Sequence, residues 1–126
     1  MLDHMRTIYE NTIKSVGPMA EEFLSEKMLI LFGEGAPNEL KDYCFVIDVV
    51  ELNEEIQTGH VLYINNEKFV ITSVGDVVCQ NLSSLGHITL KFDGSTIPHL
   101  PGTLHLEQKE IPKIRVGTKL KIVKEI

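Results

Sequence analysis

Short apolar segments separated by polar turns dominate the hydrophobic pattern of this chain. The continuous apolar run from Met28 to Phe32 is too short for an independent helix and predicts a buried strand. Residues 44–50 are rich in β-branched side chains and predict a second buried strand. The first segment, from Arg6 to Val16, alternates apolar and polar residues well enough to predict an opening strand.

The clearest local signal is a hairpin in the middle of the chain. Two apolar runs, at residues 61–64 and 67–72, flank Asn65 and Asn66. Both asparagines tolerate left-handed backbone angles, as a two-residue hairpin turn requires. Further strands are predicted at residues 87–92, 104–106 and 119–123.

The helical signals are few and short. Gly17 and Pro18 predict the start of a short amphipathic helix, because proline fits the first helical turn. A one-turn helix is expected at residues 38–42. Apolar spacing after Asp76 predicts another short helix, capped by Asp76 and ended at Gly86.

Roughly seven short strands separated by turns predict an all-β fold. We expect a small closed β-barrel with two or three short helices, because closure would cover the strand edges. Residues 1–126 are expected to form a single domain, with residues 1–5 as a loose lead-in. The chain shows no βαβ rhythm and no internal repeat.

Composition narrows the classes of function. A net charge of -6 argues against a nucleic-acid or anionic-membrane surface, which would need a basic patch. No apolar run approaches the roughly 20 residues that span a bilayer, and no signal peptide is recognisable, so a cytoplasmic protein is expected. Cys44 and Cys79 lie far apart and are interpreted as reduced thiols.

Four histidines fall within one half of the chain, at positions 60, 87, 99 and 105, which raises the question of a metal site. The segment Gly102-x-x-His105 matches one fragment of the metal motif of cupin barrels. The H-x-H pair that this motif also needs is missing, so no metal site is predicted. Metal-dependent binding by a cupin-like barrel remains a distant alternative.

Two of these histidines could carry chemistry of another kind. His87 follows Gly86 at the mouth of an apolar strand, and His105 follows a Pro-Gly turn. A histidine at a strand edge is ordinarily a half-buried, hydrogen-bonded residue. Imidazole can also act as a nucleophile in phosphoryl transfer, with one ring nitrogen attacking phosphorus while the other donates to a fixed acceptor.

Several segments occur together in a characteristic order, with near-constant spacing from about Ile8 to Lys121. They are MLILFGEGAP at 28–37, LKDYCF at 40–45, TSVG at 72–75, NL at 81–82, LGHITLKFDG at 85–94 and PGTLH at 101–105. In this combination the chain resembles the glucitol/sorbitol-specific enzyme IIA component of the bacterial phosphoenolpyruvate-dependent sugar phosphotransferase system.

The resemblance implies a cytoplasmic phosphocarrier built as a small β-barrel. Such a phosphotransferase component accepts a phosphoryl group on histidine from the histidine phosphocarrier protein. It then passes the group to the IIB component of the sorbitol IIB/IIC permease during sugar uptake, and it needs no metal or organic cofactor itself. Exposed barrel edges would permit a homodimer.

The resemblance also implies one departure. The phospho-accepting histidine of the family lies just after the C-F-[IV] strand motif, and the matching position is Ile47, which cannot accept phosphate. Its neighbour Asp48 could form an acyl phosphate in principle. The motif histidines that do match are His87, our first candidate for the catalytic residue, and His105, our second. The alternative is a non-catalytic regulatory or binding relative that keeps the barrel without the chemistry.

Overall fold

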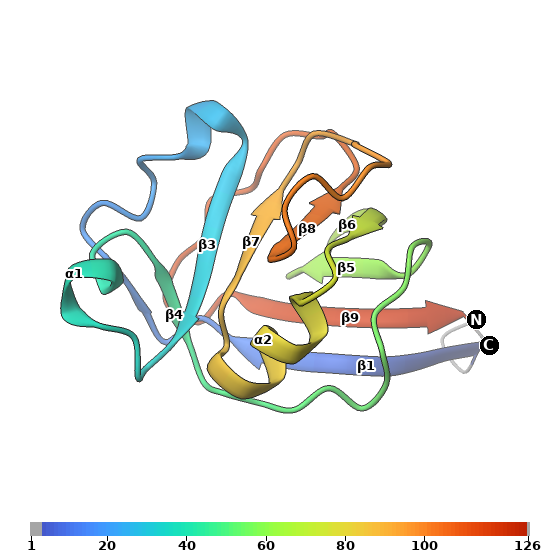
Figure 1. The fold of residues 1–126 in the computed structure, drawn as a ribbon, viewed down its shortest axis with the longest axis horizontal. Coiled ribbons are helices and arrows are strands. Elements are labelled where there is room, and N and C mark those ends of the chain that lie inside the picture. The colour runs from blue at the N-terminus through green and yellow to red at the C-terminus, as the bar shows by residue number, and fades with distance from the viewer. Residues whose placement is uncertain (1–3, 126) are drawn as a thin grey trace.

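A single sheet of nine strands forms the framework of the computed structural model, which describes residues 4–125 (Figure 1). The spatial order of the strands is β1-β9-β5-β6-β8-β7-β3-β4-β2. Their bounds are β1 Met5–Thr12, β2 Ser15–Val16, β3 Met28–Gly33, β4 Phe45–Ile47, β5 Val61–Ile64, β6 Glu67–Val74, β7 Ile88–Lys91, β8 Thr103–Leu106 and β9 Lys119–Glu125.

The expected closed barrel of seven strands is wrong, because the sheet has nine strands and its edge strands β1 and β2 do not pair with each other. Thr12 still pairs with β9, whereas Ser15 pairs with Val46 of β4, so the first segment changes partners instead of closing the sheet. The free edge of β1 is covered by a loop, since the Asn53 N–H donates to the carbonyl of Ile8. Covering an edge in this way removes the need for closure.

The hairpin prediction is confirmed. Strands β5 and β6 pair antiparallel from Ile64 and Glu67 outward, and Asn65 adopts the left-handed conformation at φ 53°. The expected loose lead-in ends earlier than predicted, because Met5 already pairs with Glu125; residues 1–3 lie outside the described part of the chain.

The helices are short, as expected: α1 spans Asn38–Lys41, α2 spans Val78–Leu85, and the 3-10 helix η2 spans Leu24–Glu26. The helix predicted after Pro18 is wrong, since turns lead there directly into η2. The predicted Asp76 cap is also wrong: Val77 is the N-cap and makes no capping side-chain bond. Gly86 does end α2, in the left-handed conformation at φ 68°.

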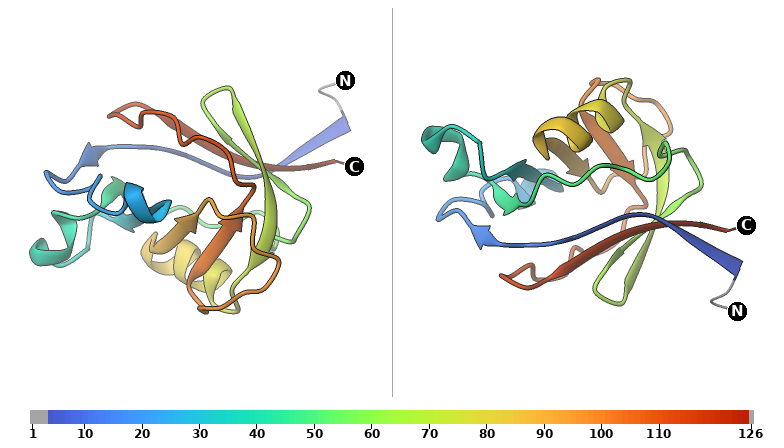
Figure 2. Two further views of the ribbon diagram at one scale, coloured as in Figure 1. Left: turned by 90° about the horizontal axis from the view of Figure 1, so that it is seen from above. Right: turned by 90° about the horizontal axis from the view of Figure 1, so that it is seen from below.

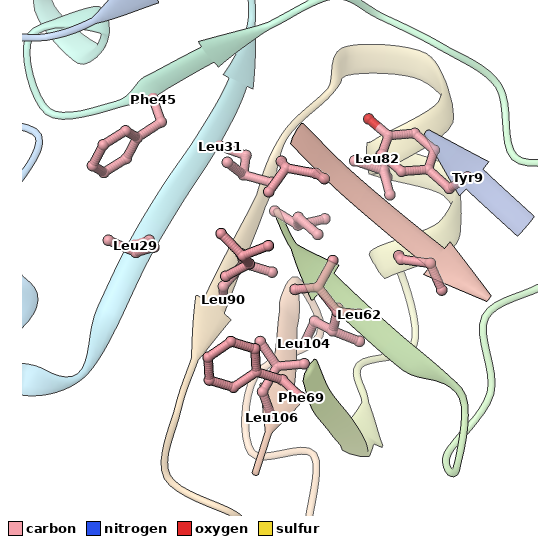
Figure 3. Packing of buried hydrophobic residues seen from close by; sticks show 14 of the residues in the cluster. Tyr9, Leu29, Leu31, Phe45, Leu62, Phe69, Leu82, Leu90, Leu104 and Leu106 are labelled. Carbon is pink, nitrogen blue, oxygen red and sulfur yellow. The ribbon is translucent and has the colours of Figure 1, made fainter. Parts of the chain in front are cut away.

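The core lies on the inward face of the coiled sheet, with Leu82 of α2 added to it (Figure 3). Along β3, Leu29 and Leu31 are buried in this core, whereas Met28, Ile30 and Phe32 are only partly buried. The prediction of a strand here is confirmed, but its full burial is not. An alternating strand buries both faces only if something covers the second one.

Both cysteines are free thiols, as predicted; Cys44 is buried and Cys79 partly so. Burial raises the pKa of both thiols. Over residues 4–125 we find no helix with the length and apolar character needed to cross a membrane.

Candidate functional site

His87 lies at the junction of α2 and β7, immediately after the glycine that ends the helix. Strands β3 and β7 run antiparallel, with Leu31 opposite Ile88. Continuing this register by one residue brings Phe32 beside His87, and the two rings are in fact stacked, with centroids 4.1 Å apart and planes inclined by 20°. The strand pairing therefore holds the imidazole against an aromatic ring.

The hydrogen bond of His87 determines which of its nitrogens is free. Nδ1 lies 3.2 Å from the carbonyl oxygen of Leu31, 56 residues away in the sequence. A carbonyl oxygen only accepts, so Nδ1 carries the proton and donates it. In the neutral ring Nε2 then holds the lone pair, and the side chain is partly exposed. This is the arrangement that a nucleophilic histidine requires.

Two glycines make room for this arrangement. A Cβ on Gly33 would lie 2.6 Å from the carbonyl oxygen of Leu85, and a Cβ on Gly86 would lie 2.9 Å from the Gly33 nitrogen. Gly86 also has a positive φ that side-chain-bearing residues rarely adopt. The helix end can therefore approach β3 closely enough to place His87 over it.

His105 lies in a different environment, inside β8. Only 1% of the residue is exposed, and its Nδ1 lies 2.9 Å from Oδ1 of Asp93. Within residues 4–125 its Nε2 has no hydrogen-bond partner and is fully buried. His105 is thus oriented like His87, with Nδ1 anchored, but a partner protein cannot reach its Nε2 in this conformation.

The carboxyl group of Asp93 is ionised at neutral pH. Burial would raise its pKa, but hydrogen bonds from His105 and from the Ser95 N–H outweigh that effect, and the charge of Lys91 adds to them. The net result is a pKa below the usual value. The anion in turn favours the Nδ1–H form of the His105 ring.

The structure does not bring the two candidate histidines together. Strands β7 and β8 are parallel, and His105 pairs with Lys91, four residues beyond His87. At about 3.3 Å per residue this separates their positions by roughly 13 Å along the sheet. They are two separate sites, and they cannot form one catalytic pair.

The other two histidines, His60 and His99, lie in different surroundings. His99 lies near His105, with ring centroids 6.2 Å apart. The Nδ1 of His60 accepts a bond from the Gln57 N–H, and its pKa is lowered by burial and by the charge of Lys124, against a weaker effect of Glu54. In the described part of the chain, no three His, Cys, Asp or Glu side chains form a group that could hold a metal ion.

Ile47 is fully buried and belongs to the core. It pairs with Gly33, and its Cγ1 lies 3.4 Å from where a Gly86 Cβ would be. Its neighbour Asp48 is exposed, 3.4 Å from the Lys14 ammonium. Position 47 therefore lies close to the Gly33–Gly86 contact but faces inward, whereas the His87 ring lies against the outward-facing Phe32.

Three partners of the histidines were not found from the sequence. The hydrophobic pattern marks Phe32 only as part of an apolar strand, the Leu31 carbonyl carries no side-chain signal, and no local pattern connects Asp93 with His105. Asp93 and His105 are twelve residues apart in the sequence, and the parallel pairing of β7 with β8 brings them together.

Comparisons with known proteins agree with this fold. The family model described as the PTS system glucitol/sorbitol-specific IIA component matches residues 8–121. Glucitol/sorbitol-specific EIIA components of Shigella flexneri and of Escherichia coli (strain K12) are each 40% identical over 117 residues, covering 93% of this chain and 95% of theirs. The crystal structure of a PTS system IIA component from Enterococcus faecalis V583 has a TM-score of 0.78 at 30% identity, covering 94% of this chain and 99% of that one. The chain belongs to the glucitol/sorbitol-specific IIA components of the phosphotransferase system.

Proposed function

We propose that this chain is a cytoplasmic phosphocarrier that accepts a phosphoryl group on Nε2 of His87. The observation that carries the proposal is the hydrogen bond from Nδ1 to the Leu31 carbonyl, which leaves a lone pair on Nε2 of a partly exposed ring. The stacked Phe32 supports it by restricting the ring's rotation. Positioning of this kind supplies much of the rate in phosphoryl transfer.

The transfer is balanced without any proton leaving His87. The Nε2 lone pair attacks phosphorus in line, the donor's nitrogen–phosphorus bond breaks, and its electron pair returns to the donor's ring. Nδ1 keeps its proton throughout and donates it in a hydrogen bond to the Leu31 carbonyl. This hydrogen bond stabilises the charge that develops on the imidazole. In the second transfer the acceptor's nucleophile attacks phosphorus, and the electron pair of the Nε2–P bond returns to His87.

The partners that we propose are those that the resemblance to the family implies. The donor is the histidine phosphocarrier protein, and the acceptor is the IIB component of a glucitol/sorbitol IIB/IIC permease. A carrier must release each partner after transfer, so interfaces at the small end of the size range suit it. A homodimer is compatible with the exposed edge of the two-residue strand β2.

His105 remains the second candidate for the phosphorylated residue. Its anchored Nδ1 and unpartnered Nε2 satisfy the electronic requirement. Only 1% of His105 is exposed, and this argues against it as the phosphorylated residue, because the loop between Asp93 and Gly102 would have to open before each transfer.

One observation favours the alternative, a non-catalytic relative with a regulatory or binding role. The resemblance assigns the family's phosphohistidine to position 47, and Ile47 is here an apolar side chain packed in the core. A relative that lost its chemistry at this position could keep His87 only for its structural hydrogen bond to Leu31.

Phosphorylation of the purified chain distinguishes these candidates. The chain is incubated with phosphoenolpyruvate, enzyme I and the histidine phosphocarrier protein, and its mass is measured after acid and after base. An acid-labile, base-stable adduct that is lost in His87→Ala and kept in His105→Ala supports the proposal. Loss only in His105→Ala moves the site, and no adduct on the folded chain supports the non-catalytic alternative.

A further inference from the structure

Exposed apolar side chains gather at one end of the sheet. Strand β3 runs parallel to β4 and antiparallel to β7, so the ends of β3 and β4 lie beside the start of β7, and Figure 1 shows them next to α2. Three large apolar residues at this end are 49%, 37% and 48% exposed, in this order: Val49, Val50 and Leu85. Most other residues of this size in the described part of the chain are buried in the core.

Two contacts bring these three residues together. A Cβ on Gly33 would lie 2.6 Å from Cγ2 of Val49 and also 2.6 Å from the carbonyl oxygen of Leu85. The Leu52 N–H donates to the Ser83 hydroxyl, which holds the segment after β4 against α2. The segment that carries Val49 and Val50 therefore runs along the end of the helix that carries Leu85, and the three side chains belong to one patch.

The patch borders His87. Leu85 precedes His87 by two residues, and a Cβ on the intervening Gly86 would lie 2.9 Å from the Gly33 nitrogen. The ring stacked on His87 belongs to Phe32, the residue before Gly33. The two segments that hold the imidazole in place are thus the same two that Val49 and Leu85 flank.

Acidic side chains surround the patch. Glu34 follows Gly33, Asp48 precedes Val49 and Glu51 follows Val50, and all three are exposed. Asp48 lies 3.4 Å from the Lys14 ammonium, whereas Glu34 and Glu51 form no ion pair within residues 4–125. The segments that supply this end of the sheet, residues 28–40, 42–67 and 69–90, contain neither lysine nor arginine. We call the patch and its rim the strand-end surface: Glu34, Asp48, Val49, Val50, Glu51 and Leu85.

We infer that the strand-end surface is the docking surface for the phosphoryl donor, a protein that carries its phosphoryl group on a histidine. This inference rests on the proposed function. In-line transfer needs the reacting atoms about 3–3.5 Å apart, so the donor's surface must cover the residues that border His87. An apolar patch with an acidic rim is complementary to a donor surface with an apolar centre and basic residues around it.

The composition of the surface fits a partner that binds and leaves quickly. Exposed apolar side chains that form a contiguous patch are typical of interaction sites. Three such side chains make a small patch, which suits a complex that must dissociate after each transfer. Complementary charges at the rim act mainly on the rate of encounter and are screened by salt. A charge substitution at the rim should therefore have an effect that depends on ionic strength.

Glu34→Lys tests the charged part of the surface. Glu26→Lys is the matched control: Glu26 is also exposed, but it precedes β3, and the strand separates the two positions by roughly 20 Å. Both substitutions change the net charge equally. Two rates are measured for each variant at low and at high ionic strength: phosphorylation by the histidine phosphocarrier protein and phosphorylation by phosphoramidate, a small donor that needs no docking surface.

We expect Glu34→Lys to lower the carrier-dependent kcat/KM about fivefold or more at low ionic strength, mainly through KM, and the loss to shrink at high ionic strength. The phosphoramidate rate should not fall, and Glu26→Lys should behave like the wild type. If Glu34→Lys and Glu26→Lys have equal carrier-dependent rates while phosphoramidate labels both, the docking surface is overturned and the proposed function stands.

Leu85→Gln tests the apolar part without a change of charge. Its control is Ile97→Gln, because Ile97 is 60% exposed in the loop that leaves the other end of β7. We expect Leu85→Gln to lower the ratio of the carrier-dependent rate to the phosphoramidate rate about threefold or more, since a buried apolar side chain is lost from the complex. An unchanged ratio in the folded variant would contradict an apolar contact at this end of the sheet.

A titration separates failure of the inference from failure of the proposed function. The amide spectrum of the ¹⁵N-labelled chain is recorded with increasing unphosphorylated phosphocarrier protein. Shifts concentrated at Glu34, Val49, Val50 and Leu85 support the docking surface even if neither donor labels the chain, in which case only the proposed function fails. Shifts confined to other parts of the chain, or no shifts at millimolar partner, overturn the inference.

Discussion

The imidazole of His87 is stacked on the phenyl ring of Phe32, with centroids 4.1 Å apart and planes inclined by 20°. The same imidazole donates from Nδ1 to the carbonyl of Leu31, the residue before Phe32. Two consecutive residues of β3 therefore fix both the plane of the ring and its tautomer. A reactive nitrogen held in this way loses little freedom when it attacks phosphorus.

Phe32→Leu should slow phosphorylation of His87 by phosphoramidate without unfolding the protein. Stacked aromatic pairs contribute about 0.5–1.5 kcal/mol beyond their buried area, so a loss of roughly two- to tenfold in rate is expected. Phe32→Tyr, which keeps the ring, should restore the rate. A rate in Phe32→Leu equal to that of the wild type would show that the stacking does not position the imidazole.

Gly33→Ala should destabilise the fold and Gly35→Ala should not. The Gly33 Cβ would lie 2.6 Å from the Leu85 carbonyl oxygen, a contact that only a backbone shift can relieve, whereas a Cβ on Gly35 meets nothing within 4 Å. We expect a loss of about 1–3 kcal/mol for the first variant, as for other overpacked sites. Urea unfolding of both variants measures the difference, and equal midpoints would contradict the close approach of β3 and α2.

Asp93→Ala should lower the free energy of unfolding by about 1–3 kcal/mol, because it leaves the Nδ1–H of buried His105 without an acceptor. The same substitution should leave phosphorylation of His87 intact where the protein is folded. Chemical denaturation and the phosphoramidate rate test the two parts separately. A large loss of His87 labelling in folded Asp93→Ala would mean that the two sites are coupled.

The pH dependence of stability offers an independent test of Asp93. Its hydrogen bonds from His105 and Ser95, opposed by burial, lower its pKa in the folded state. The carboxylate therefore stabilises the native state above its unfolded pKa of about 3.9, and this contribution is lost as the pH falls through the lower folded value. Between pH 5 and pH 2 the wild type should lose more stability than Asp93→Asn. Parallel curves would contradict an ionised, hydrogen-bonded Asp93.

Local patterns predicted most of the strands because each is encoded by neighbouring residues. The Asn65–Asn66 turn, the apolar run before Gly33 and the glycine that ends α2 all appear where expected. The wrong predictions concern features that depend on contacts between segments far apart in the sequence. Whether the sheet closes depends on the change of partner between Thr12 and Ser15, and the region after Pro18 forms turns where a helix was expected.

The candidate site was predictable only in part, for the same reason. Histidine chemistry identified His87 and His105 as candidates, but their environments depend on strand register. The Leu31 carbonyl and Phe32 reach His87 across 56 and 55 positions, and the covered state of His105 depends on the loop that follows β7. No local pattern distinguishes the partly exposed His87 from the buried His105.

The most direct test of the central claim is the identity of the phosphorylated nitrogen. The chain, labelled with ¹⁵N in its histidine rings, is phosphorylated by the carrier protein, and the phosphorus–nitrogen couplings are assigned by NMR, with His87→Gln as the reference. The anchored Nδ1 predicts phosphate on Nε2 of residue 87. Phosphate on Nδ1, on another residue, or on none of the folded protein would contradict the claim.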